Sequence, residues 1–166
     1  MLRIATIGTS MITDDFIQVV NANDQAAFVG TLSRDANRGA AFTAKHGGER
    51  NFTALDELTS ADDVDAVYIG SPNALHHEQA LACIAGGKHV IVEKPFCATE
   101  AQALEVFRAA EAAGVDGRDD LGVGELAASG EVGAADSQDV VTVDLIALAV
   151  HEQYAVGVAV VGQTDV

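Results

Sequence analysis

Short apolar runs of strand length alternate with helix-forming segments from residue 2 to residue 114. The runs Leu2–Ile7, Ala26–Leu32, Val64–Ile69 and His89–Val92 are apolar almost throughout, which is typical of strands buried on both faces. Turn residues follow each run, and a segment with helical spacing comes next. This alternation predicts an α/β fold with a doubly wound parallel sheet.

The helices between these strands have recognisable ends. In the first, Thr13 is predicted as the N-cap, with Asp14 and Asp15 in the first turn, where the helix dipole favours acids. Further helices are expected over Ala36–His46, closed by Gly47; over Ala74–Ala85, with Leu75, Ala82 and Ile84 facing inward; and from Thr99, with Gln102 at the capping-box position, to Gly114. A short strand and a helical turn are expected within residues 49–58.

Composition excludes several classes of partner. The net charge of −16 argues against nucleic acids and anionic membranes, since both need a positive surface. The chain shows no signal-peptide pattern and no long apolar run, so we predict a cytoplasmic protein without a membrane span. Cys83 and Cys97 do not form a CxxC pair and are consistent with a reducing compartment, although the sequence does not exclude a disulfide.

The chain changes character near Gly114. Residues 116–166 hold 10 acidic groups and a single basic group, Arg118. We therefore expect one domain over residues 1–115 and a short irregular appendage over residues 116–166. Within that appendage, 116–124 reads as a loop, Val140–Val143 as a candidate strand and Leu145–Val161 as a candidate helix.

The turn after the first strand is a candidate anion site. Gly8, Thr9 and Ser10 stand where a dinucleotide fold has G-x-G-x-x-G, but Ser10 and Thr13 replace the second and third glycines. The helix N-terminus still offers N–H groups and a positive dipole to a phosphate. A plain strand-to-helix turn is the alternative.

The end of the second strand bears on the choice of cofactor. An acid there suits the ribose of NAD, whereas an arginine suits the 2′-phosphate of NADP. Ser33 and Arg34 occupy this place, with Arg38 one helical turn further on, so NADP is slightly favoured over NAD. In the alternative interpretation Arg34 is solvated and Asp35 merely caps the helix.

Two later turns lie at the same predicted edge. Ser71-Pro72-Asn73 follows the strand that ends at Ile69, and His76 stands near the start of the next helix, where a packing or capping role is the alternative. Glu93-Lys94-Pro95 follows the strand His89–Val92, which places Lys94 outside the carboxyl ends of the strands. The histidines and cysteines show no ligand spacing, so no metal site is predicted.

These segments together resemble the N-terminal half of the glucose–fructose oxidoreductase / inositol dehydrogenase / MocA family. The resemblance covers Leu2 to about Gly114. It rests on Ile7-Gly8-Thr9-Ser10, on Leu32-Ser33-Arg34, on Asp65-Ala66-Val67-Tyr68-Ile69-Gly70-Ser71-Pro72-Asn73-Ala74-Leu75-His76 and on Ala85-Gly86-Gly87-Lys88-His89-Val90-Ile91-Val92-Glu93-Lys94-Pro95.

The resemblance implies a Rossmann domain that binds NAD(P), and hydride transfer between the nicotinamide and a hydroxyl-bearing carbon of a sugar, polyol or related molecule. It implies that Lys94 lies near the nicotinamide and the substrate hydroxyl, where a cation stabilises developing oxyanion charge. The residues predicted to bind the cofactor are Gly8, Thr9, Ser10, Ile12, Ser33, Arg34, Arg38, Ser71, Pro72, Asn73, His76, Glu93, Lys94 and Pro95.

The family's second domain, which covers the cofactor and supplies an acid–base residue, is too large for residues 116–166. The resemblance therefore implies that residues 116–166 are a truncated or degenerate remnant of that substrate domain. The segment from Ala149 to Gly162 faintly resembles the helix that carries the base, which makes His151 a second catalytic candidate. The aspartate expected one turn earlier is Ala147.

Three functions remain open at this point. The first is an NAD(P)-dependent oxidoreductase that acts on a small molecule, with a homo-oligomer as one possible assembly. The second is a non-catalytic nucleotide-binding module or an inactive enzyme fragment. The third is a partner subunit whose apolar C-terminal segment docks on another chain.

Overall fold

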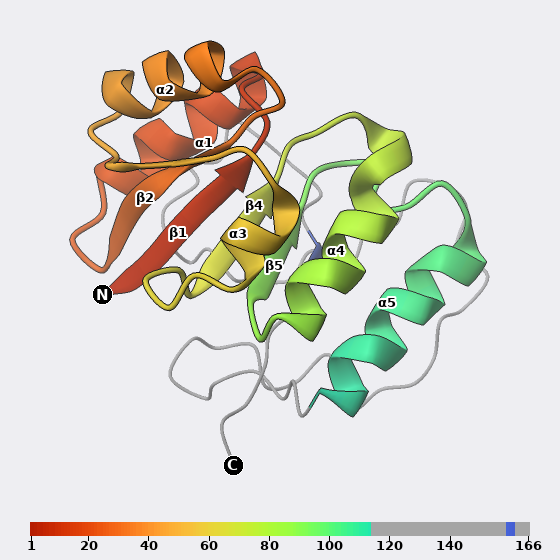
Figure 1. Ribbon diagram of the computed structural model, residues 1–166. Coiled ribbons are helices and arrows are strands. Elements are labelled where there is room, and N and C mark those ends of the chain that lie inside the picture. The colour runs from red at the N-terminus through yellow and green to blue at the C-terminus, as the bar shows by residue number, and fades with distance from the viewer. Residues whose placement is uncertain (114–158, 162–166) are drawn as a thin grey trace.

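The computed structural model describes residues 1–113 and 159–161 of the chain, and its strands form one sheet in the order β3-β2-β1-β4-β5-β6 (Figure 1). The strands are β1 (Leu2–Ile7), β2 (Ala26–Leu32), β3 (Arg50–Phe52), β4 (Ala66–Ile69), β5 (His89–Val92) and β6 (Ala159–Val161). Strands β1 to β5 pair in parallel, whereas β6 pairs antiparallel with β5. The strand order confirms the predicted doubly wound α/β fold.

Helices cover both faces of this sheet (Figure 1). They are α1 (Met11–Asn21), α2 (Ala36–Lys45), α3 (Leu55–Thr59), α4 (His76–Ala85) and α5 (Glu100–Ala112), with a 3₁₀ turn, η1, over Asn73–Leu75. Helices α1 and α2 lie on one face, and α3, α4 and α5 lie on the other. None of the helices in the described ranges is long and apolar enough to cross a membrane.

Alternate side chains of each central strand enter different cores. In β4, Ala66 packs with Ile17 and Val20 of α1, whereas Val67 and Ile69 pack with α3, α4 and α5. A strand buried on both faces needs apolar residues at successive positions, which explains the uninterrupted apolar runs in the sequence.

The predicted N-cap of α1 is wrong by three residues. The helix begins at Met11, and Ser10 is its N-cap, with Oγ accepting from the N–H of Thr13 at 3.3 Å. Thr13 is fully buried inside the first turn. Either hydroxyl residue is a good cap by propensity, so tertiary packing of Thr13 decides between them.

The inward face of α4 also differs from the expectation. His76, Ala80, Cys83 and Ile84 are buried, whereas Leu75 precedes the helix and is only partly buried, as is Ala82. Because η1 precedes α4, the helical phase begins at His76, and of the three residues expected to face inward only Ile84 is buried.

Other local predictions are confirmed. Gly47 follows α2 with a φ of 78°. Asp35 caps α2 by accepting from the N–H of Arg38 at 3.0 Å, which is the cap that the alternative interpretation of this segment expects. Thr99 caps α5 by accepting from the N–H of Gln102 at 3.3 Å. Both cysteines are free, and burial raises the pKa of Cys83 to about 12.

The far C-terminal segment is described over three residues. The candidate helix Leu145–Val161 is wrong at its end, because Ala159–Val161 is strand β6 and pairs with Val90, Ile91 and Val92. The rest of that segment, the candidate strand Val140–Val143 and His151 lie outside the described residues, and the domain boundary near residue 115 stays a prediction.

Candidate functional site

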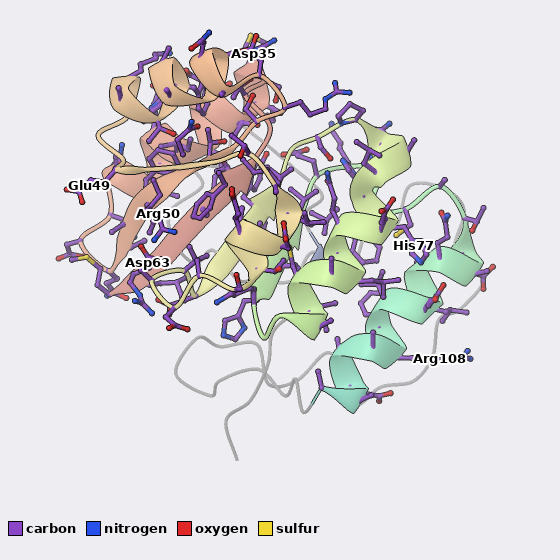
Figure 2. All side chains as sticks on the ribbon, in the orientation of Figure 1. Asp35, Glu49, Arg50, Asp63, His77 and Arg108 are labelled. Atoms are coloured by element: carbon purple, nitrogen blue, oxygen red, sulfur yellow. The ribbon has the colours of Figure 1, made fainter. Side chains whose placement is uncertain are left out.

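The loops that follow β1, β2, β4 and β5 lie at the carboxyl edge of the sheet. Strand β1 pairs with β2 on one side and with β4 on the other, so the chain order reverses between β1 and β4. Such a reversal point is where open α/β sheets bind ligands. In Figure 2, Asp35 marks this edge at the start of α2, and the ion pair of Arg50 with Asp63 lies well away from it.

The glycine turn after β1 is tightly packed against the end of β4. Gly8 has a φ of 106°, and a Cβ there would lie 2.7 Å from the carbonyl oxygen of Gly70. Its N–H donates to the carbonyl of Leu32 at 3.0 Å, and the hydroxyl of Thr31 donates to its carbonyl at 3.1 Å. Only glycine fits this position, as the sequence predicts.

The helix that follows this turn approaches β4 unusually closely. A Cβ at Gly70 would lie 2.5 Å from Oγ1 of Thr13, and that oxygen is also 2.9 Å from Oγ of Ser10. Thr13 stands where the dinucleotide motif has its helix-packing glycine. The glycine that permits close packing is therefore on the strand side, at Gly70, and the sequence analysis missed it.

An acid in the first turn of α1 is neutralised by α2. Asp14 accepts hydrogen bonds from Lys45 and from the ring of His46, which is 2.9 Å away. These contacts, led by the one with Lys45, lower the pKa of Asp14. The charge of Asp14 near the helix N-terminus is thus balanced, which favours attraction of an anion by the dipole of α1.

Two guanidinium groups follow β2. Ser33 is buried, and its Oγ accepts from the N–H of Asp35 at 3.3 Å. Arg34 is exposed and has no hydrogen bond or ion pair with any residue in the described ranges. Arg38 is also exposed, but its Nη2 donates to the carbonyl of Thr9 at 3.2 Å, which ties α2 to the glycine turn. Arg34 is therefore the more available cation.

The loop after β4 holds Ser71, Pro72 and Asn73. Ser71 is partly buried, and its Oγ donates to Oε1 of Gln79 at 2.5 Å. Pro72 and Asn73 are exposed, and the Pro72 carbonyl accepts from the N–H of Leu75 at 2.9 Å to close η1. The loop thus has a fixed base and an exposed tip.

The turn after β5 combines a buried acid with an exposed lysine. Glu93 is buried and accepts a hydrogen bond from the hydroxyl of Tyr68, while its Oε2 accepts from the N–H of Lys94 at 3.1 Å. Burial, and then the bond to Glu93, raise the pKa of Tyr68 far above its usual value. Lys94 and Pro95 are exposed, and the peptide bond between them is cis.

The Glu93 carboxylate is held by hydrogen bonds on both oxygens. These oxygens accept hydrogen bonds from the Tyr68 hydroxyl and from the backbone N–H of Lys94, and Glu93 forms no ion pair with the Lys94 ammonium. Within the described part of the chain the Lys94 side chain has no hydrogen-bond or ion-pair partner. The ammonium is therefore available to a ligand at this edge of the sheet.

His76 lies beneath both of these loops. Its ring is buried, with Nδ1 3.0 Å from the carbonyl oxygen of Pro95 and Nε2 2.9 Å from that of Ser71. The neighbouring His77 instead points toward α5 (Figure 2), where it meets Glu105 at 3.0 Å.

Most sequence-predicted residues thus gather on four neighbouring loops, while His151 lies outside the described residues. Tyr68, Gly70 and Gln79 were missed as supporting residues. A buried tyrosine hydroxyl needs a polar partner, and this was the one signal in the sequence that Tyr68 reaches a charged side chain. Within the described ranges no group of histidine, cysteine, aspartate and glutamate side chains could hold a metal ion.

A doubly wound sheet with a positive-φ glycine before its first helix defines a nucleotide-binding domain of the Rossmann class. The model of the Gfo/Idh/MocA oxidoreductase family, NAD-binding Rossmann fold, matches residues 2–116, and the chain belongs to this family.

Curated relatives match the same part of the chain. It is 44% identical over 115 residues to scyllo-inositol 2-dehydrogenase (NADP(+)) IolU of Bacillus subtilis, covering 69% of this chain and 35% of that protein. It is 40% identical over 115 residues to 1,5-anhydro-D-fructose reductase of Ensifer adhaerens, covering 69% of this chain and 34% of that protein. The chain thus spans about a third of the length of these relatives.

Solved structures agree with this assignment. KijD10, a 3-ketoreductase from Actinomadura kijaniata determined with NADP and TDP-benzene, superposes with a TM-score of 0.64 at 32% identity, over 67% of this chain and 35% of that one. GenD2 from gentamicin A biosynthesis, determined with NAD, has a TM-score of 0.64 at 29% identity, over 67% of this chain and 32% of that one.

Proposed function

We propose that this chain binds NADP(H) in preference to NAD(H) and serves as the cofactor-binding part of an oxidoreductase acting on a hydroxyl-bearing carbon of a sugar, polyol or related compound. The observation that carries the proposal is the exposed Lys94 ammonium, without a partner among described residues, at the same sheet edge as the Gly8 turn.

The residues present fit a nicotinamide dinucleotide. The N-terminus of α1 and the Gly8 turn suit the pyrophosphate. Pro72, Asn73 and Lys94 present an exposed surface at the neighbouring strand ends, which suits the nicotinamide half. When bound, the nicotinamide ring supplies the hydride acceptor or donor of the reaction.

Arg34 supports NADP as the preferred cofactor. A guanidinium at the end of the second strand suits the 2′-phosphate, and Arg34 has no competing partner in the described ranges. Arg38 is already engaged with Thr9, so its first contribution is to hold the glycine turn. The NADP in the printed name of the Bacillus subtilis relative agrees with this preference.

Lys94 supports the oxidoreductase assignment. Glu93 accepts hydrogen bonds from Tyr68 and from a backbone N–H, and the Lys94 ammonium forms no ion pair with it. A free ammonium there can orient the substrate oxygen and stabilise negative charge as it develops. We keep His151 as the candidate for the general base.

A non-catalytic nucleotide-binding module is the second candidate. It is favoured by one observation, that the chain spans about a third of its curated relatives. Cofactor binding by this chain, without turnover even when it replaces the matching third of a full-length relative, would support it.

A pair of cofactor titrations tests the proposal. We expect saturable binding of NADPH, followed by the cofactor's own fluorescence, and weaker binding of NADH. Arg34→Ala should weaken NADPH binding by about 10-fold, the value of one lost charged hydrogen bond, and leave NADH binding within about 2-fold. Equal losses for both cofactors would remove the argument for NADP, and no binding to either would refute the proposed function.

A further inference from the structure

His76 joins two backbone segments that the sequence separates. Its Nε2 lies 2.9 Å from the carbonyl oxygen of Ser71, five residues earlier, and its Nδ1 lies 3.0 Å from that of Pro95, 19 residues later. The first carbonyl belongs to the loop after β4 and the second to the turn after β5. The imidazole of His76 therefore lies between the Ser71–Asn73 loop and the turn that contains Lys94.

The ring is held in place by the protein core. His76 opens α4, and Ala80 and Cys83 on the same helix are fully buried against the sheet. The ring itself is fully buried, so it offers no surface to a ligand. Its effect on bound molecules must pass through the two loops that it contacts.

Those loops have exposed tips and few other ties. Pro72, Asn73, Lys94 and Pro95 are exposed, whereas Ser71 and Phe96 beside them are partly buried. Phe96, next in the turn, packs against the core and lies 5.4 Å from the ring of Phe107, centroid to centroid. Within the described ranges, His76 is the side chain whose two ring nitrogens lie within hydrogen-bond distance of carbonyl oxygens of both loops.

We propose that His76 is a positioning residue that sets the separation of the Ser71–Asn73 loop and the Lys94–Pro95 turn, and thereby shapes the subsite for the nicotinamide ring. This inference rests on the proposed function, since it concerns one half of the same site. It assigns His76 an indirect role, in place of the direct cofactor contact predicted from the sequence.

Three substitutions of His76 remove its contacts with Ser71 and Pro95 one at a time or together. In His76→Asn the side-chain amide nitrogen can replace Nδ1 and keep the tie to Pro95. In His76→Gln it can replace Nε2 and keep the tie to Ser71, and His76→Leu keeps neither. His77→Gln is the matched control, because His77 is the next residue on α4 but contacts Glu105 of α5.

Two ligands separate the halves of the site. NADPH carries the nicotinamide, and 2′-phospho-ADP-ribose lacks only that ring. Calorimetric titration of each variant with both ligands yields the ratio of their affinities. If the wild-type chain prefers NADH, the matched pair is NADH and ADP-ribose.

His76→Leu should lower the affinity for NADPH about 10-fold and leave that for 2′-phospho-ADP-ribose within about 2-fold. The Asn and Gln variants should lose less, and His77→Gln should match the wild type. If His76→Leu does not fold, the affinity ratios of the Asn and Gln variants decide.

An equal loss of both ligands, or an unchanged ratio in every His76 variant, would overturn the positioning role while the proposed function stands. A wild-type chain that binds neither ligand would overturn both.

Discussion

At the residue scale, buried side chains fix the positions of the exposed residues of the candidate site. Lys94 is exposed, but its backbone N–H is fixed by Glu93, and Glu93 is fixed by Tyr68. Tyr68 in turn stacks on Phe16 of α1, with ring centroids 3.9 Å apart. The helix at the glycine turn and the lysine turn are therefore joined through three side chains.

Removal of the Tyr68 hydroxyl tests this chain of contacts. Tyr68→Phe leaves a buried carboxylate oxygen of Glu93 without its donor, which should lower the free energy of unfolding by about 1–3 kcal/mol. Chemical denaturation measures this loss.

Glu93→Gln provides the matching control. In the Tyr68→Phe background it replaces the stranded charge with a neutral amide, so the double variant should lose less than the sum of the two single losses. Strictly additive losses would show that the hydroxyl and the carboxylate do not stabilise one another.

At the scale of single elements, the sequence predicts where strands and helices lie better than how they pack. Strands β1, β2 and β5 have the predicted bounds because uninterrupted apolar runs of that length indicate buried strands. The cap of α1 was misassigned because the fit of Thr13 against Gly70 is a contact between distant segments. Which residues of α4 face inward depends on the 3₁₀ turn η1 before it, and no sequence feature predicts that turn.

The contact between α1 and β4 yields a prediction at this scale. Gly70→Ala places a Cβ 2.5 Å from Oγ1 of Thr13, and this overpacking should cost about 1–3 kcal/mol of stability. Thr13→Ala in the same chain removes the obstructing oxygen and should restore part of the loss. Thermal unfolding of the two single variants and the double variant gives the coupling energy.

A second Cβ contact limits the expected rescue. Cε1 of Tyr68 would lie 3.0 Å from the new methyl group, so recovery should be incomplete. Two results would contradict the idea that Gly70 permits the close packing of Thr13. One is a Gly70→Ala variant as stable as the wild type. The other is a double variant in which Thr13→Ala adds its full single-variant loss of stability.

At the scale of the whole molecule, the candidate site could be predicted in outline from strand ends alone. Parallel strands bring Gly8, Arg34, Asn73 and Lys94 to one edge, whatever their separation in the chain. Their supporting contacts could not be predicted, because Tyr68 and Glu93 are 25 residues apart and His76 and Pro95 are 19 apart. The pairing of β6 with β5 joins residues still further apart in the chain and is antiparallel, and no local pattern indicates it.

A chimera tests the function at this scale. A stretch of 115 residues of this chain matches 35% of the Bacillus subtilis scyllo-inositol 2-dehydrogenase, and in the chimera it replaces that part of the enzyme. We expect the chimera to oxidise scyllo-inositol with NADP⁺ and the isolated chain to bind cofactor with little or no turnover. In the chimera, Lys94→Ala should reduce turnover by at least about 100-fold, the scale on which losing one preorganised charge acts, with NADPH affinity within a few-fold. Unchanged turnover in that variant would refute the role proposed for Lys94, because the reaction would then proceed equally fast without the Lys94 ammonium.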